Sequence, residues 1–161
     1  MIQEKVISEE IDYAAFLIID TLLQGIKGAK LLLILKKGWK KWKLVGGKKN
    51  PAFNENPIQT VIREVGEEIG KIIANIIRVD TSNRFFEINV TNEEEPHKFI
   101  VFAERMPDFN ILERVVLEPG IERVAIFDER QLVNMLKMDQ ILPLHSEAIQ
   151  QYLADCGVLL S

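Results

Sequence analysis

Cysteine and histidine are scarce in this chain of 161 residues, which holds one cysteine and two histidines. The single thiol, Cys156, excludes a disulfide within the chain and leaves no disulfide partner. Sparse cysteine is typical of the reducing cytoplasm, which is the location we expect. No Cys/His cluster with the spacing of zinc ligands is present, so the sequence argues against a zinc site.

Long apolar runs are also missing. The runs 14–19 and 31–35 have the length of strands, so we expect no membrane span and no membrane partner. Segment 1–10 carries four charges and no apolar core, so we expect no signal peptide there. With 47% hydrophobic and 27% charged residues, the composition is that of a globular protein, and we expect a single domain over 1–161.

The chain has no overall positive charge. Its formal charge of −4 gives no general attraction for nucleic acid. Seven lysines are nevertheless crowded into one short stretch: Lys36, Lys37, Lys40, Lys41, Lys43, Lys48 and Lys49. This run is compatible with a solvated hairpin or with a rim that attracts anions, and the sequence leaves both interpretations open.

The pattern of apolar residues and breakers predicts a mixed α/β chain. Strands are expected at 14–21, 30–36, 41–45, 72–79, 84–90, 98–105 and 124–127, with loops at 48–56 and 92–96. Helices are expected at 129–136 and 144–155, in addition to one that begins after Asn56. Strands, a helix, more strands and two final helices predict an α/β fold of the α+β type, with a mixed central sheet covered on both faces.

The helix that begins after Asn56 has clear boundary signals. Asn56 is a suitable N-cap, Pro57 suits the first helical position, and Gly70 suits the C-terminal end. Apolar residues recur inside at spacings of three and four, which predicts one buried face. Gly66 costs about 1 kcal/mol relative to alanine inside a helix, so we expect another group to approach closely there.

Three carboxylates share one face of this helix. Glu64, Glu67 and Glu68 stand at positions i, i+3 and i+4, where like charges repel unless a cation lies between them. Oxygen ligands at this density suit Mg²⁺ or Mn²⁺. The alternative is a solvated acidic face in which Arg63 pairs with a neighbouring glutamate.

The spacing around these glutamates resembles the Nudix box. In that family a Glu and seven intervening residues precede Arg-Glu-aliphatic-any-Glu-Glu-any-Gly, and here Glu55 and residues 56–62 precede Arg63–Gly70 in the same register. A chance match of this kind is expected on the order of once in a hundred thousand such chains. The preceding sequence Trp42-Lys43-Leu44-Val45-Gly46-Gly47 resembles the family's Trp-x-Leu-Pro-Gly-Gly entry, and the resemblance extends over about 14–132.

The chain departs from the family pattern at three places. Lys49 stands where the box glycine is expected, six positions before Glu55, and Gly47 comes two residues earlier, so the loop is longer by two residues. Lys71 replaces the aliphatic residue after Gly70, and Val45 replaces the usual proline.

The resemblance implies a Nudix-type α/β/α sandwich with a loop–helix–loop catalytic motif. It also implies a Mg²⁺-dependent hydrolase, with Mn²⁺ as an alternative cofactor, that cleaves a nucleoside diphosphate linked to another moiety. Its partners are then a small nucleotide-derived substrate and, as in many relatives, a second copy in a homodimer. The implied metal ligands are Glu64, Glu67, Glu68 and a backbone carbonyl at Gly47, while Arg63 and Glu55 hold the glutamates in place.

The substrate itself has no clear signature. Phe85, Phe86 and Trp39 are candidates to stack on a base, as is Phe53, although one of the two adjacent phenylalanines is expected in the core. Glu118 is a candidate for an additional acidic group that acts in proton transfer. The two histidines, His97 and His145, are expected at the surface or as caps.

Three other classes of protein compete with the hydrolase. A Nudix-fold module that binds a nucleotide for regulation without cutting it would normally lack box glutamates, which are all present here. An isomerase of a diphosphate ester would need a cysteine in the site, and Cys156 lies near the C-terminus. A structural or interaction domain with a coincidental acidic helix is disfavoured by the spacing.

Overall fold

The computed structural model describes residues 12–23, 25–91, 97–107, 110–158 and 160. The expectations about segment 1–10 and the turn at 92–96 lie outside these residues. In the described chain, six strands form one mixed sheet with the order β4-β5-β1-β2-β6, and β3 pairs with β1 off this path. The strands are β1 (Tyr13–Asp20), β2 (Lys30–Lys36), β3 (Val45–Lys48), β4 (Arg84–Val90), β5 (His97–Arg105) and β6 (Ile121–Asp128).

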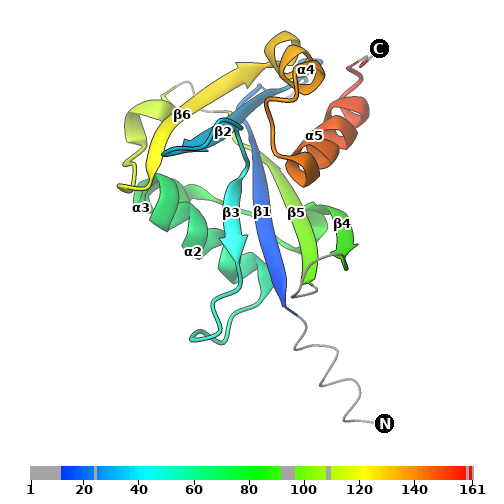
Figure 1. Cartoon of the computed structure of the whole chain (residues 1–161). Helices are drawn as coiled ribbons and strands as arrows, with labels where there is room; N and C mark the ends of the chain where they lie inside the picture. Colours follow the sequence, from blue (N-terminus) through cyan, green and yellow to red (C-terminus); the bar gives the residue numbers. More distant parts are fainter. Residues whose placement is uncertain (1–11, 24, 92–96, 108–109, 159, 161) are drawn as a thin grey trace.

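Helices cover both faces of the sheet (Figure 1). One face carries α2 (Pro57–Ile69) and α3 (Lys71–Ile76), and the other carries α4 (Glu129–Lys137) and α5 (Pro143–Asp155). Two short 3₁₀ helices, η1 (Thr81–Asn83) and η2 (Ile111–Arg114), lie in the connections. The expected mixed sheet in an α/β/α sandwich is therefore confirmed.

Each face of the sheet has its own hydrophobic core, and β1 contributes to both. Its side chains alternate, so Leu17 packs with the α2 layer, whereas Phe16 and Ile18 pack with the α5 layer. Every residue of β1 is buried. This explains why the strand has an uninterrupted apolar sequence, in contrast to the half-exposed edge strand β4.

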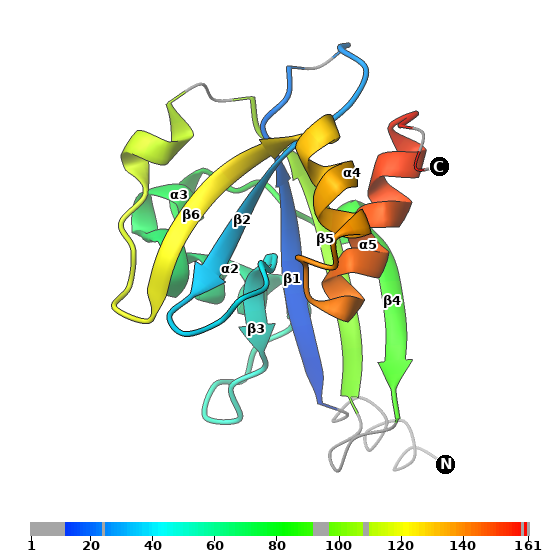
Figure 2. The ribbon, with the colours of Figure 1, turned by 45° about the horizontal axis from the view of Figure 1, so that its top comes forward.

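The sheet opens beside β1, and this opening positions the site. Asp20, at the end of β1, pairs with Leu31 of β2, whereas 14–17 at the other end pair with β3. Figure 2 shows β2 diverging from β1 and β3 lying beside the lower half of β1, over α2. Gly46 and Gly47 of β3 thereby come against the helix that carries the acidic residues.

The boundaries of α2 agree with the prediction. Asn56 accepts a hydrogen bond from the backbone N–H of Gln59, which in turn accepts one at its side chain from the Asn56 N–H. Pro57 begins the helix, and Gly70 follows its last residue with a positive φ of 108°. The strands at 14–21, 30–36, 84–90, 98–105 and 124–127 and the helices at 129–136 and 144–155 are also found, within a few residues.

Three expectations were wrong. Segment 72–79 contains most of helix α3 (Lys71–Ile76) instead of a strand; within this helix Ile73 is buried in the core below α2, while Ile72 is exposed. The third strand is 45–48 instead of 41–45, since only single bridges join Lys43 to Ile34 and Trp42 to Ile141. The close approach expected at Gly66 is absent: an added Cβ would meet only Ala74 Cβ, at 3.5 Å.

Among the described residues, no helix is long and apolar enough to cross a membrane.

Candidate active site

Gly46 and Gly47 of β3 lie against two of the box glutamates. The backbone N–H of Gly46 donates to Glu68 Oε1 over 2.7 Å. A Cβ on Gly46 would lie 2.3 Å from the carbonyl oxygen of Ala15, and its φ is +130°, so only glycine fits there. A Cβ on Gly47 would lie 2.7 Å from the Cδ of Glu64. Although the following loop is longer by two residues than the family pattern, these glycines therefore lie beside the acidic face of α2.

Arg63 gathers the carboxylates around its guanidinium group. It donates to Glu55 at 2.8 Å, to Glu67 at 2.9 Å and to Glu64 at 3.1 Å. It also donates to the carbonyl oxygen of Lys48 over 3.2 Å, which ties the end of β3 to α2. Hydrogen bonding to Arg63 holds the pKa of Glu55 below its usual value, and the same bond raises the pKa of Arg63.

Glu55 is fixed to the sheet as well as to Arg63. The Tyr13 hydroxyl donates to the Glu55 carbonyl oxygen over 2.9 Å and lies 2.8 Å from the Thr60 hydroxyl. The Asn50 N–H donates to the Glu55 carboxylate over 3.3 Å. Sequence reasoning missed Tyr13, because its position at the start of an apolar strand gives no sign of this contact.

Glu68 is buried and paired with a lysine that the sequence did not mark as part of the site. The Nζ of Lys43 lies 3.4 Å from Glu68 Oε2 and 3.2 Å from the carbonyl oxygen of Gly46. Burial raises the pKa of Glu68 and lowers the pKa of Lys43, and the attraction between the two charges opposes both changes. Burial also raises the pKa of Glu64, while the Arg63 charge opposes the change.

The donor set fits a hard divalent cation in its chemistry. Glu64, Glu67 and Glu68 offer carboxylate oxygens, and Gly46 and Gly47 of β3 offer backbone carbonyl oxygens. Both are oxygen ligands of the kind that Mg²⁺ and Mn²⁺ prefer. Within the described part of the chain, however, no three acidic, histidine or cysteine side chains already converge as metal ligands. Arg63 and Lys43 engage the three carboxylates instead, so a metal would have to compete with these two cations.

A cavity of about 610 Å³ opens beside Gly46 and Gly47 of β3. Its size is in the range of small-molecule sites. Gly46, Gly47 and Lys43 form the wall nearest the box glutamates, and Trp39 lines it as well. Its remaining lining residues are Ala14, Phe16, Lys36, Lys48, His97, Phe99, Leu142, Pro143, Leu144 and His145.

The other candidate substrate residues lie elsewhere. Phe85 and Phe86 do not line this cavity: Phe85 packs against Tyr152 and Phe86 against Phe99, with ring centroids 5.8 Å and 6.2 Å apart. Phe53 lies under the guanidinium of Arg63, 5.6 Å from it. The backbone N–H of Glu118 donates to the carbonyl oxygen of Glu68 over 3.4 Å, so the Glu118 loop lies at the C-terminal end of α2.

His145 is buried, which contradicts the expectation of a surface or capping residue. Its Nδ1 accepts a hydrogen bond from the Leu44 N–H over 3.0 Å, and its ring contacts Phe16 and Phe99. Burial lowers the pKa of His145 to about 3. A neutral ring therefore holds the segment that leads into β3.

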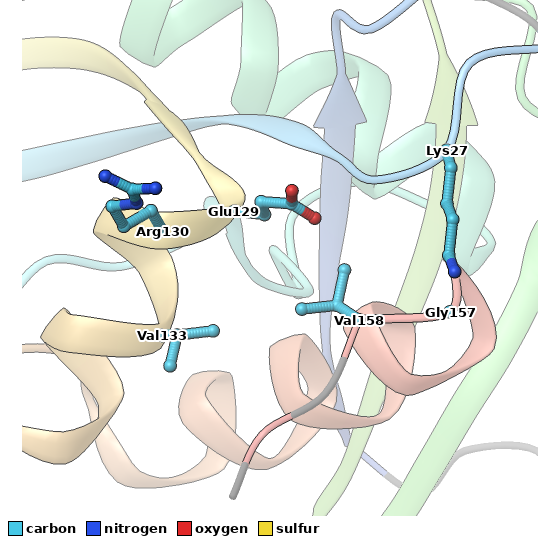
Figure 3. Close-up of a pocket in the computed structure, with 6 residues that line it drawn as sticks. All are labelled: Lys27, Glu129, Arg130, Val133, Gly157 and Val158. Carbon is cyan, nitrogen blue, oxygen red and sulfur yellow. The ribbon is translucent and has the colours of Figure 1, made fainter.

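A second cavity, of about 500 Å³, lies far from these groups (Figure 3). Its lining residues come from α4, from the loop before β2 and from the segment after α5: Lys27, Glu129, Arg130, Val133, Gly157 and Val158. No box residue lines it, so we do not place the chemistry there.

An α/β/α sandwich in which two glycines of β3 lie against an acidic, capped helix defines the class of protein. The family model for the NUDIX domain matches residues 16–151, and the chain belongs to the Nudix family. A comparison with curated proteins gave no significant match.

Solved structures share this fold. The NUDIX domain of Shewanella oneidensis NrtR, complexed with ADP ribose, is 16% identical, with a TM-score of 0.62 over 87% of this chain and 84% of the other. A C. elegans Ap4A hydrolase is 19% identical, with a TM-score of 0.58 over 90% and 99%. A bifunctional NMN adenylyltransferase/ADP ribose pyrophosphatase from Francisella tularensis, with AMP and a Mn ion, is 17% identical, with a TM-score of 0.58 over 96% of this chain and 46% of the other.

Proposed function

We propose that this protein hydrolyses the diphosphate linkage of a nucleoside diphosphate joined to another moiety, with Mg²⁺ or Mn²⁺ as cofactor. The observation that carries the proposal is the contact of Gly46 and Gly47 of β3 with Glu68 and Glu64, directly beside a cavity of about 610 Å³. Family membership supports it, as do relatives described as an Ap4A hydrolase and an ADP ribose pyrophosphatase.

In this proposal Glu64, Glu67, Glu68 and a carbonyl of Gly47 would hold the metal. When bound, a divalent cation neutralises phosphate oxygens and lowers the pKa of water. Arg63 is a positioning residue, because it contacts two of the three glutamates and anchors them to Glu55. A carboxylate of this group would accept the proton of the attacking water, a contribution typically of about 10²–10⁴-fold.

The cavity supplies what substrate binding needs. Trp39 offers an aromatic surface at its edge, and Phe16 and Phe99 give it an apolar floor. A base or another flat moiety could lie here while the diphosphate extends toward Gly47.

A regulatory module that binds a nucleotide without cutting it is the second candidate. The pairing of Glu68 with Lys43, and of Glu64 and Glu67 with Arg63, favours it, because none of the three carboxylates lacks a cation. Under this alternative the cavity would still bind a nucleotide derivative, but no product would form.

A substrate panel separates the two candidates. The protein would be incubated with Mg²⁺, and then with Mn²⁺, and with nucleoside triphosphates, nucleotide sugars, ADP-ribose and dinucleoside polyphosphates, with products separated by chromatography. Glu67→Gln should lower turnover by roughly 10²-fold or more, typical of a lost catalytic group. Glu147→Gln, an exposed glutamate on α5, is the matched control and should retain full activity.

Silence of the wild type across the panel with both metals would overturn the hydrolase. Saturable binding of a panel compound without turnover would then support the regulatory module.

A further inference from the structure

Three lysines lie over aromatic rings along one side of the molecule. Lys36 Nζ is 5.1 Å from the ring centroid of Trp39, and Lys43 Nζ is 5.3 Å from that of Phe16. Lys49 Nζ is 5.8 Å from the ring centroid of Tyr13. Both members of the first two pairs line the cavity of about 610 Å³, and both members of the third line a neighbouring cavity of about 320 Å³.

The two cavities adjoin each other. Both are lined by Lys48 and His97, so they are neighbours at the 14–17 end of β1, beside β3, and we treat the pair as one groove. We call this the lysine groove and define it by Lys36, Lys43, Lys48 and Lys49. One end of it reaches Gly46 and Gly47, which contact the box glutamates.

The positive charge of the groove is poorly neutralised by the protein. In the described chain no ion pair joins a carboxylate to Lys36, Lys48 or Lys49. The larger cavity has no acidic lining residue, and the smaller one has Asp12. Lys43 alone has such a partner, Glu68. Three ammonium groups therefore face the groove without an acidic partner.

The lysines of the run fall into two sets, according to whether they line these cavities. Lys37, Lys40 and Lys41 line neither cavity, and Lys41 is bonded to Asp139 over 2.8 Å. These three are the solvated part of the hairpin. The other four line the two cavities, which is the position that an anion-attracting rim would need.

A diphosphate at the box glutamates does not account for this charge. An ammonium over an aromatic ring stays charged and keeps donors free for an anion. A neutral sugar or a nicotinamide-like ring would gain little from three unpaired lysines, whereas a row of phosphates would gain from each. We propose that the lysine groove binds a chain of phosphates that extends beyond the scissile diphosphate, so that the substrates are compounds with three or more phosphates in a row.

This inference rests on the proposed function, but its first test needs no turnover. Binding of inorganic tripolyphosphate and of pyrophosphate would be measured by calorimetry with EDTA present, at about 0.1 M salt to limit screening. Tripolyphosphate should bind roughly tenfold more tightly than pyrophosphate. The double variant Lys36→Met/Lys49→Met should lose this preference, whereas Lys37→Met/Lys40→Met, with the same change in charge, should keep it.

A second variant controls for loss of binding through a change in fold. Lys36→Arg/Lys49→Arg keeps both charges and should retain the preference for tripolyphosphate. Equal binding of the two anions by the wild type would overturn the inference. It would also be overturned if Lys37→Met/Lys40→Met lost the preference for tripolyphosphate as much as Lys36→Met/Lys49→Met does.

Turnover then separates the inference from the proposed function. With Mg²⁺, the wild type should have a KM about tenfold lower for nucleoside triphosphates or dinucleoside polyphosphates than for ADP-ribose. Lys36→Met/Lys49→Met should raise the KM for the polyphosphate compounds and leave the KM for ADP-ribose unchanged. Cleavage of ADP-ribose without any polyphosphate preference would overturn the inference and leave the hydrolase standing. Tight polyphosphate binding without cleavage of any compound would overturn the hydrolase and leave the binding of phosphate chains in the groove standing. Comparison of tripolyphosphate with adenosine polyphosphates in the same assays distinguishes inorganic from nucleotide ligands.

Discussion

Gly47 lies directly against the carboxylate of Glu64. A Cβ at this position would come within 2.7 Å of Glu64 Cδ and 2.8 Å of both carboxylate oxygens. Because the obstructed atoms are the end of a flexible side chain, an alanine could be accommodated if Glu64 moved aside. The absence of a side chain at Gly47 thus leaves room for the Glu64 carboxylate beside β3. This glycine stands two residues before the position where the family pattern expects one.

Gly47→Ala should therefore separate catalysis from folding. We expect the free energy of unfolding to change by less than about 1 kcal/mol, because the clash is relieved by a side-chain rotation. Turnover of the substrate identified in the panel should fall by about 10²-fold, the scale typical of a catalytic group displaced by about 1 Å. Urea titration and steady-state kinetics measure the two effects, and unchanged kcat in the folded variant would contradict the contact's role.

Gly66→Ala should stabilise the protein. Gly66 is inside α2, and an added Cβ would meet only the Cβ of Ala74 at an ordinary contact distance of 3.5 Å. Alanine is favoured over glycine in a helix interior by about 1 kcal/mol, which for a chain of this size should raise Tm by about 2–4 °C. A lower Tm would show that the helix needs glycine here.

The contrasting variant is Gly46→Ala. Its Cβ would lie 2.3 Å from a backbone carbonyl oxygen, in a region of φ that L-residues rarely adopt. We expect a loss of several kcal/mol. The two substitutions, identical in chemistry, should therefore change the urea midpoint in opposite directions.

His145 should make stability depend on pH. The unfolded histidine binds a proton below about pH 6.5, whereas burial keeps the folded ring neutral until about pH 3. Between these values the unfolded state binds more protons, so the free energy of unfolding falls as pH decreases. The largest contribution, reached below pH 3, is at most about 5 kcal/mol.

His145→Asn tests this dependence. The Asn oxygen can accept the Leu44 N–H bond now made by Nδ1, but it does not take up a proton in this range. The variant should be less stable at pH 7, because it loses the contacts with Phe16 and Phe99, and its stability should change less between pH 6.5 and 4.5. Urea titrations at several pH values measure both slopes, and parallel slopes would show that His145 does not cause the dependence.

Local signals in the sequence predicted the elements of the fold that carry their own boundaries. Asn56, Pro57 and Gly70 gave both ends of α2, and the uninterrupted apolar runs gave β1 and β2. Segment 72–79 was assigned wrongly because its β-branched residues favour a strand, whereas packing against α2 selects a helix.

The site was predictable only where a motif fixes it. The spacing of Arg63, Glu64, Glu67 and Glu68 identified the acidic face, but contacts between distant segments left no local signal. The pairing of Lys43 with Glu68 arises because β3 enters the opening between β1 and β2, and neither residue alone indicates the other. Phe85 and Phe86, chosen for their rings, contact α5 and the sheet instead of the cavity.

Lys43 should weaken metal binding at Glu68. Its ammonium lies 3.4 Å from the Glu68 carboxylate and 3.2 Å from the Gly46 carbonyl oxygen, both of them oxygen donors that suit Mg²⁺ or Mn²⁺. A divalent cation must displace this charge to reach Glu68, because two cations at such distances repel. Lys43→Met keeps the length and apolar contacts of the side chain but removes the competing charge, so Mn²⁺ should bind about tenfold more tightly or with one additional ion per chain.

Mn²⁺ titration followed by electron paramagnetic resonance gives both the affinity and the number of ions. Lys41→Met is the matched control, because Lys41 also precedes β3 but is bonded to Asp139, away from the glutamates. Adding Glu68→Gln to Lys43→Met should abolish the gain, since the carboxylate that the lysine releases is then absent. If Lys43→Met folds and binds Mn²⁺ with the affinity and number of the wild type, Lys43 does not compete with the metal, and its ammonium serves only to balance the charge of Glu68.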